Sequence, residues 1–357
     1  MITQTPKFAQ VKKPFHVELK TRINQYFATT GKQQTGGYRL FWKAVFLVTA
    51  LVYTYVQLVF FTPGVLVSLL LCALLGAITA GIGFNVMHDG GHGSFSENPI
   101  INKAAAITAE FLGASHFMWN VKHNIVHHTY TNIDGIDDDI DARPFLRMAS
   151  SQKRYKMHRY QHWYFWIFYA ILHLYWSMVS DYKKYFTGMV GIKALQKMNF
   201  LDHLTFWGFK IIHYSVFIVI PIVKLGFLNW LIGYSVFTVV AGFILSIVFQ
   251  LAHTVEHTEF PMPDEATNKM GDEWAIHQLK TTANFATKNR WISWYVGGLN
   301  FQVEHHLFPK ISHIHYPEIS KIIKQACQEY GVVYVEYPRM HQAVFSHISF
   351  LKQMGRA

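Results

Sequence analysis

Nine of the 21 histidines in this chain of 357 residues fall into four short motifs. The motifs contain His88 and His92, then His123, His127 and His128, then His253 and His257, and finally His305 and His306. The first three motifs each hold a pair four residues apart, and on a helix two such residues share one face. At that spacing two imidazoles can bind one metal ion. In the two adjacent pairs, the neighbouring ring points about 100° away, towards a second ion.

Metal binding accounts for the four motifs together better than separate structural roles do. One such pair alone is more often a surface or structural feature, but many imidazoles in one place would leave polar atoms without partners. Imidazole suits zinc, iron, copper and nickel, and nine ligands are too many for one ion and fit two. Two ions held mainly by nitrogen fit paired iron used for oxygen chemistry. Gln302 keeps the period of the fourth motif, four residues before His306.

The composition excludes several classes of protein. Hydrophobic residues make up 51% of the chain and charged residues 15%, which is too apolar for a disordered chain or a polar scaffold. Two cysteines, Cys72 and Cys327, are too few for a disulfide framework or for a zinc or iron–sulfur site bound by cysteine. The histidines are therefore the candidate metal ligands.

Four apolar runs must position these motifs. None contains an acidic residue, and Lys210 is the only cation within them; the runs are 44–61, 65–87, 204–223 and 225–252. About 20 residues at ~1.5 Å each cross a hydrocarbon layer ~30 Å thick. The first run starts too late, and lacks the small-residue cleavage site, for a signal peptide. The sequence thus predicts an all-α integral membrane protein with four transmembrane helices in two hairpins.

The positive charges predict the orientation of the spans. Of the 32 lysines and arginines, all but Lys210 and Lys224 fall on the side of the two termini. We therefore expect both termini and the histidine motifs to be cytoplasmic. The same asymmetry explains the net charge of +11 without a nucleic-acid partner.

Two shorter apolar stretches, 104–119 and 163–180, are expected to lie flat on the cytoplasmic face as interfacial helices, because runs of this length seldom span. If either spanned, the motifs would lie on opposite sides of the membrane. The predicted divisions are a basic cytoplasmic segment, 1–39, and one membrane domain, 40–357, whose helical cytoplasmic cap consists of 88–203 and 253–357 and holds a dimetal site.

The motifs resemble those of the membrane fatty acid desaturases. The strings are HDGGH at 88–92, HNIVHH at 123–128 and QVEHH at 302–306, the last within the most specific string, GLNFQVEHHLFP at 298–309. The resemblance covers roughly residues 35–340. Gln302 in place of a histidine is similar to the front-end branch, which includes linoleoyl-CoA desaturases and acts between an existing double bond and the carboxyl end. The resemblance implies a four-span helical bundle with a cytoplasmic cap.

The resemblance also implies the metal ligands. In that family, the histidines of the three motifs, with a further pair at the end of the fourth span, bind two iron ions. Here they are His88, His92, His123, His127, His128, His253, His257, His305 and His306. The match of His253 and His257 is by location only, because a relative can carry asparagine at the position of His253. Three roles stay open for Gln302: a direct ligand, a ligand through water, or no ligand.

Carboxylates near the motifs are candidates for orienting the ligands. Asp89, Glu256 and Glu304 lie inside the motifs, and metal-bound histidines usually donate their second N–H to a carboxylate or carbonyl. Solvated or helix-capping roles fit these three about equally well. An acidic run follows the second motif and is expected to be a polar loop; it consists of Asp134, Asp137, Asp138, Asp139 and Asp141.

The implied reaction is O₂-dependent desaturation of a fatty acyl chain. Two Fe²⁺ ions and O₂ would introduce a cis double bond into an acyl-CoA or acyl-lipid, with electrons from a separate ferredoxin or cytochrome and its reductase. A separate donor is expected because residues 1–43 contain no His-Pro-Gly-Gly haem motif. The same observation favours a bacterial inner membrane over the endoplasmic reticulum. The sequence assigns no residue to substrate binding and no position to the double bond.

Three alternatives stay open at this point. A hydroxylase, ketolase or acetylenase of the same superfamily would use the same histidines. The string His253-Thr254-Val255-Glu256-His257 also matches the H-x-x-E-H pattern of inverted zinc metalloproteases, although that leaves seven histidines unexplained. A metal transporter would place its polar ligands at mid-membrane, whereas these motifs lie at the ends of the spans and beyond.

Overall fold

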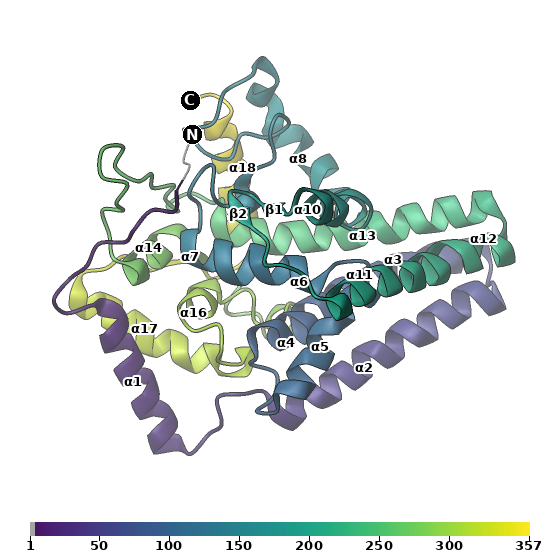
Figure 1. Ribbon diagram of the computed structural model, residues 1–357, viewed down its shortest axis with the longest axis horizontal. Coiled ribbons are helices and arrows are strands. Elements are labelled where there is room, and N and C mark those ends of the chain that lie inside the picture. Colours follow the sequence, from purple (N-terminus) through teal and green to yellow (C-terminus); the bar gives the residue numbers. More distant parts are fainter. Residues whose placement is uncertain (1–3) are drawn as a thin grey trace.

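Four long apolar helices lie side by side in the computed structural model, which describes residues 4–357 (Figure 1). Each is long and apolar enough to cross a membrane; they are Gly37–Phe61, Val65–His92, Phe200–Leu225 and Phe227–His253. The four predicted spans are therefore confirmed. Large apolar side chains such as Phe46, Leu66 and Phe227 are exposed on the outer faces of these helices, as a lipid environment requires.

The spans form two hairpins joined by short turns. The first hairpin consists of α2 (Gly37–Val56), η1 (Gln57–Phe61), α3 (Val65–Ile82), η2 (Gly83–Met87) and α4 (His88–His92), where η1 and η2 are π-helical. The second consists of α11 (Phe200–Tyr214), the π-helical η7 (Ser215–Val219), α12 (Ile220–Leu225) and α13 (Phe227–His253). Helices α3 and α13 pack closely, because a Cβ at Gly76 would lie 2.5 Å from the carbonyl oxygen of Phe237.

Shorter helices form a cap at the end of the bundle away from the hairpin turns (Figure 1). Before and between the hairpins these are α1 (Phe15–Thr30), α5 (Pro99–Phe111), α6 (His116–Trp119), η3 (Asn120–His127), α7 (His128–Tyr130), η4 (Asp138–Ile140), η5 (Lys156–Tyr160), α8 (Gln161–Ala170), α9 (Leu172–Tyr175), η6 (Trp176–Ser180) and α10 (Asp181–Thr187). After the fourth span they are α14 (Trp274–Thr281), α15 (Arg290–Tyr295), α16 (Gln302–Leu307), η8 (His313–His315), α17 (Tyr316–Tyr330) and α18 (Met340–Met354).

The predicted basic N-terminal segment is built into this cap. Helix α1 buries Leu19 and Ile23 in a core that also contains Leu279, Ile319 and Ile323 from α14 and α17. The apolar residues of α1 recur every four positions, which gives the helix one buried stripe. Figure 1 shows α1 and the C-terminal helix α18 at the same end of the molecule. The predicted boundary at residue 40 stays a prediction.

Two small sheets complete the fold. Strands β1 (Met189–Val190) and β2 (Lys193–Ala194) pair antiparallel, with Val190 opposite Lys193. Strands β3 (Ala283–Phe285) and β4 (Val335–Tyr337) pair parallel, with Asn284 opposite Glu336. These short strands leave the predicted helical class confirmed.

The two short apolar stretches form interrupted helices and are not among the four long spans in residues 4–357. Helix α5 packs against α4 and α11, and helices α8 and α9 pack against α13. They therefore connect the histidine-bearing ends of the spans to the cap.

Candidate metal centre

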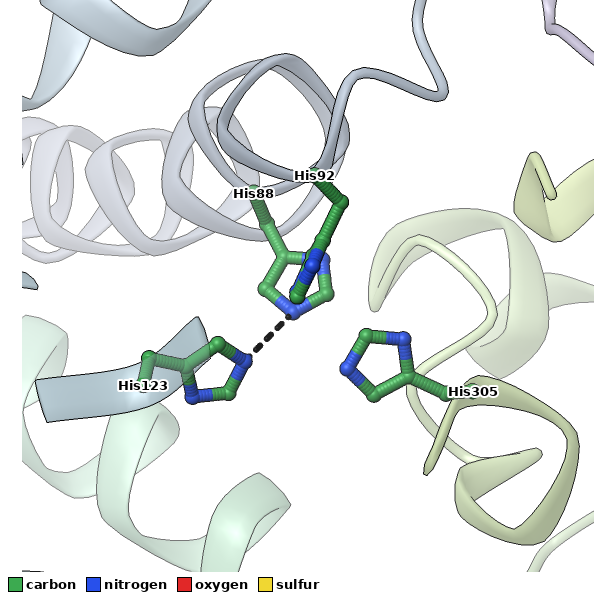
Figure 2. Close-up of side chains that lie close together, drawn as sticks. All are labelled: His88, His92, His123 and His305. Atoms are coloured by element: carbon green, nitrogen blue, oxygen red, sulfur yellow. Dashed lines mark hydrogen bonds between the residues drawn. The ribbon is translucent and has the colours of Figure 1, made fainter. Parts of the chain in front are cut away.

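Four histidines from three segments converge in a first group (Figure 2). Helix α4 carries His88 and His92, η3 carries His123, and α16 carries His305. One ring nitrogen from each lies within 4.8 Å of the others, and all four side chains are buried. Nε2 of His88 lies 3.2 Å from Nε2 of His123. Four nitrogens at such distances can share one ion.

A second group consists of His127, His253 and His306, whose ring nitrogens also lie within 4.8 Å of one another. They come from the end of η3, the last residue of α13 and α16. His128 lies between the two groups, with its ring centroid 4.6 Å from that of His305 and 4.5 Å from that of His306. Eight of the nine predicted histidines are therefore brought together.

His257 is the exception. The predicted helical pair with His253 is wrong, because α13 ends at His253 and the chain turns sharply at Thr254. His257 has a positive φ of 74° and an exposed side chain. Gln302 is buried at the first position of α16, and its burial does not distinguish between its three roles.

Local packing positions the first two motifs. A Cβ at Gly90 would lie 2.6 Å from the backbone nitrogen of Ala106 in α5, and one at Gly91 would overlap the ring of Trp119. The two glycines of HDGGH therefore let α4 lie directly against its neighbours. The second motif is π-helical, and its wider turn places residues i and i+5 together. The rings of His123 and His128 accordingly lie 4.7 Å apart.

Several imidazoles form a hydrogen bond through Nδ1 and have no partner at Nε2 within the described residues. Nδ1 of His306 lies 2.9 Å from Oε1 of Gln278, Nδ1 of His305 lies 3.2 Å from the Tyr316 hydroxyl, and Nδ1 of His253 lies 3.2 Å from the Thr281 carbonyl oxygen. Within residues 4–357, buried Nε2 atoms have no hydrogen-bond partner in His92, His253, His305 and His306. An imidazole anchored through Nδ1 with Nε2 free is the arrangement of a metal ligand. The residues present thus fit a pair of bound metal ions.

Burial governs the charge of these rings. Burial, reinforced by neighbouring imidazoles, lowers the pKa of His123, His128, His305 and His306. These rings are neutral at pH 7, which is the form that binds metals. Burial also opposes the charged form of His127, but Asp137 and Asp139 outweigh it and raise the pKa of that ring. The two carboxylates thus favour a positive charge at this ring, and a metal cation bound in the second group would provide that charge in place of the proton.

Of the three carboxylates predicted to orient ligands, one lies beside the cluster. Oδ1 of Asp89 is 3.8 Å from Nδ1 of His88, while its other oxygen accepts a hydrogen bond from His313 at 2.9 Å. Glu304 instead accepts hydrogen bonds from Asn284 and Tyr334, both at 2.7 Å. Burial raises the pKa of Glu304 to about 7.

Glu256 has a different environment, since it is half-buried and its carboxylate accepts hydrogen bonds from Ser349 and Gln353. No hydrogen bond within residues 4–357 joins the carboxylates of Glu256 or Glu304 to a histidine of either group. These two predictions therefore find no support in the geometry.

Four residues that contact the Nδ1 atoms of the histidines were not predicted from the sequence. They are Asp137, Gln278, Thr281 and Tyr316. Asp137 belongs to the acidic run expected to be a polar loop, but its carboxylate is buried 3.0 Å from Nδ1 of His127. The proximity of that run to the second motif is the only sequence signal for any of the four.

The fold and the buried histidine groups define a helical membrane protein with a metal-binding centre in its cap. A model of the fatty acid desaturase family matches residues 63–338, which is more than half of the chain. The chain therefore belongs to the fatty acid desaturase family, whose members are oxidoreductases.

Individual relatives cover almost the whole chain. It is 39% identical to the sn-1 linoleoyl-lipid 6-desaturase of Synechocystis sp. over 98% of both proteins. It is 36% identical to the enzyme of the same name from Arthrospira platensis, over 96% of this chain and 92% of the relative. An acyl-lipid (8-3)-desaturase of Physcomitrium patens is 33% identical, over 96% of this chain and 72% of the relative. The resemblance to front-end desaturases is thus confirmed.

The metalloprotease alternative is not supported. His253 and His257 do not share a helix face, and His253 instead lies with His127 and His306.

Proposed function

We propose that this protein is an O₂-dependent di-iron desaturase that acts on acyl chains of membrane lipids towards their carboxyl end. The observation that carries the proposal is the pair of buried histidine groups, in which Nε2 of His92, His253, His305 and His306 has no hydrogen-bond partner within residues 4–357. Imidazole ligands are compatible with iron as with zinc, copper and nickel, and iron is the metal that the resemblance to the membrane fatty acid desaturases implies. The names of the relatives, linoleoyl-lipid 6-desaturase and acyl-lipid (8-3)-desaturase, support an acyl-lipid substrate and the front-end type.

The proposed ligands divide between two ions. His88, His92, His123 and His305 would hold one ion, and His127, His253 and His306 the other. His128 lies close enough to both groups to complete either of them. His257 is not in the proposed set, and Gln302 keeps its three candidate roles: a direct ligand, a ligand through water, or no ligand.

When bound, ferrous iron would supply the oxidising chemistry: two hydrogens would leave neighbouring methylene carbons, and O₂, with two electrons from a separate carrier and two protons from water, would become two waters. The chain's own contribution is placement. Gln278, Tyr316 and Thr281 fix three rings through Nδ1, and Trp119 stacks on His123 with centroids 4.7 Å apart. Burial of all these rings excludes bulk water from the centre.

The partners and location follow from the same proposal. Electrons would come from a separate ferredoxin or cytochrome with its reductase. We place the cap and both termini in the cytoplasm, because the lysines and arginines gather on that side of the spans. The cyanobacterial relatives support a bacterial membrane as the host membrane.

The test combines metal analysis with product analysis. The unaltered chain and His127→Ala are expressed in a host that is fed linoleate, and total fatty acids are profiled by gas chromatography–mass spectrometry. We expect a more unsaturated product from the unaltered chain alone, and two irons per purified chain. A hydroxylated product would move the protein to the hydroxylase branch. Protein that holds two irons and receives electrons yet forms no product would overturn the proposal.

A further inference from the structure

An open groove of about 460 Å³ runs along the outside of the histidine centre. One wall is the glycine-rich α4, including His92 itself, and the other is the start of α5 with Asn102 and Lys103. His116 and Lys310 also line the groove. The groove therefore reaches from the surface to a residue of the first histidine group.

The groove is positively charged. Lys103 and Lys310 both line it and are exposed, and no aspartate or glutamate is among its lining residues in the described part of the chain. His116 adds no charge at pH 7, because burial and the nearby Lys103 lower its pKa. The side-chain amide of Asn102 is already hydrogen-bonded within the protein: its Oδ1 accepts the backbone N–H of Ser96, and its Nδ2 donates to the carbonyl oxygen of Ser96. Neither ammonium group forms an ion pair within residues 4–357, so the two groups are cations available to bind a phosphate.

The groove lies near the start of the first span. The backbone N–H of Gly37, at the start of α2, donates to the carbonyl oxygen of Phe95, just before α5, at 3.1 Å. The next residue of α2, Tyr38, is 71% exposed, and such aromatic side chains mark the headgroup level of a bilayer. Beside the groove, Ile100 is 76% exposed on the first turn of α5. An exposed isoleucine beside cationic groups fits the boundary between acyl chains and headgroups.

We propose that this groove binds the anionic phosphodiester headgroup of a membrane lipid and holds the acyl chain of that lipid against the histidine centre. The proposal rests on the proposed function for the reaction at the centre. A headgroup bound beside His92 would leave only a short stretch of acyl chain to reach the histidine centre, so the carbons nearest the carboxyl end would be the ones presented there for oxidation. The groove thereby gives a physical reason for front-end selectivity. Lys103 and Lys310 act as specificity-determining residues.

The first test measures binding without catalysis. The full chain is placed in galactolipid nanodiscs with or without dilinoleoyl phosphatidylglycerol, and acetylation of individual lysines by a brief reagent pulse is followed by mass spectrometry. We expect phosphatidylglycerol to slow the labelling of Lys103 and Lys310 about fivefold relative to Lys197, an exposed lysine outside the groove. The internal reference removes the general effect of an anionic surface. Equal slowing of all three lysines would overturn the proposal.

A further set of samples distinguishes binding of a lipid headgroup from binding of free phosphate. Inorganic phosphate added to galactolipid nanodiscs should leave the labelling of the two groove lysines unchanged. Protection by phosphate alone, to the same degree as by the lipid, would overturn the assignment to a lipid headgroup.

The second test measures selectivity. Nanodiscs containing dilinoleoyl phosphatidylglycerol and a dilinoleoyl galactolipid are supplied with electrons, and the products on each lipid are compared. Replacing both lysines, Lys103→Gln with Lys310→Gln, should lower the preference for the anionic lipid at least about fivefold. The matched control, Lys156→Gln with Lys197→Gln, removes two exposed charges elsewhere and should keep the preference.

The outcomes of the two tests distinguish a failure of the groove proposal from a failure of the proposed function. An unchanged preference in the groove variant would overturn the role of the groove in selectivity. Absence of turnover on every lipid, with selective protection of the groove lysines intact, would count against the proposed function while supporting the binding site.

Discussion

Oδ2 of Asp137 lies 3.0 Å from Nδ1 of His127, and both side chains are buried. The same carboxylate oxygen accepts the backbone N–H of Asn132 at 2.9 Å, which fixes its position. Asp139 approaches the same ring nitrogen to 3.3 Å. A carboxylate in this position sets the orientation of the imidazole and makes its other nitrogen a stronger ligand.

Asp137→Asn should therefore weaken metal binding about 10- to 100-fold, because the amide keeps the volume but loses the charge facing His127. Metal retention is measured by titrating the purified protein with a chelator. The matched control is Asp141→Asn, since Asp141 is exposed and its only ion-pair partner among residues 4–357 is Arg143 at the surface. Equal metal retention in both variants would contradict a role for Asp137 in orienting His127.

The end of α13 gives a second prediction, which uses two histidines four residues apart. His253→Ala removes one of the three nitrogens of the second group, so we expect iron content to fall from two ions per chain towards one and desaturation to be lost. His257→Ala changes only an exposed side chain and should retain both ions and activity. Iron per chain is measured by mass spectrometry of the purified variants. Loss of iron from the His257 variant would show that the loop after α13 can fold onto the centre.

The contact between Asp137 and His127 and the end of α13 at His253 mark the limits of prediction from the sequence. The spans and the histidine spacing follow from hydropathy and helical period, which are local properties. The position at which α13 ends depends instead on a residue far away in the sequence. Nδ1 of His347, in α18, lies 2.6 Å from the carbonyl oxygen of Thr254. That contact fixes the turn after His253. A regular helical pattern therefore continues in the sequence beyond the point where the helix ends.

The anchoring residues were hidden for a similar reason. Asn132 has a positive φ of 59°, and its amide donates to the carbonyl oxygen of His253 at 2.9 Å. The turn at this residue folds the acidic run back onto its own motif, so that Asp137 meets His127. Gln278 reaches His306 from α14, in a part of the sequence without any metal motif. Such partners depend on tertiary packing, which spacing within a motif does not contain.

The glycines of the first motif provide a third prediction. A Cβ at Gly91 would overlap Trp119, whose ring packs against His88, His92 and His123. Gly91→Ala should therefore destabilise the protein by about 1–3 kcal/mol and reduce its iron content. Thermal unfolding in detergent measures the first effect. In the control Gly208→Ala on α11, the added Cβ meets nothing within 4 Å, so the unfolding temperature should not fall. Equal behaviour of the two variants would refute the packing argument.

Glu110 gives a prediction of pH dependence away from the histidine centre. Its side chain is 3% exposed at the end of α5, where it accepts hydrogen bonds from Ser115 and from the backbone of His116. Burial, together with the nearby Asp181, raises the pKa of Glu110 from its ordinary 4.5 to about 7. The folded protein thus holds this proton more tightly than the unfolded chain does.

The sign follows from this difference. Below pH 4.5 the carboxyl is protonated in both states, and its favourable effect on folding is fully present; as the pH rises through about 7, the buried group must ionise and that stability is lost. Glu110→Gln keeps a neutral acceptor at all pH values. The variant should unfold at nearly the same temperature as the parent at pH 5 but at a higher temperature at pH 8, by a margin worth on the order of 2–3 kcal/mol.

Glu318→Gln, which removes an exposed partner of Lys321, should change little at either pH. A Glu110 variant that is less stable than the parent at pH 8 would mean that the ionised carboxylate is stabilised in the fold, contrary to the burial argument.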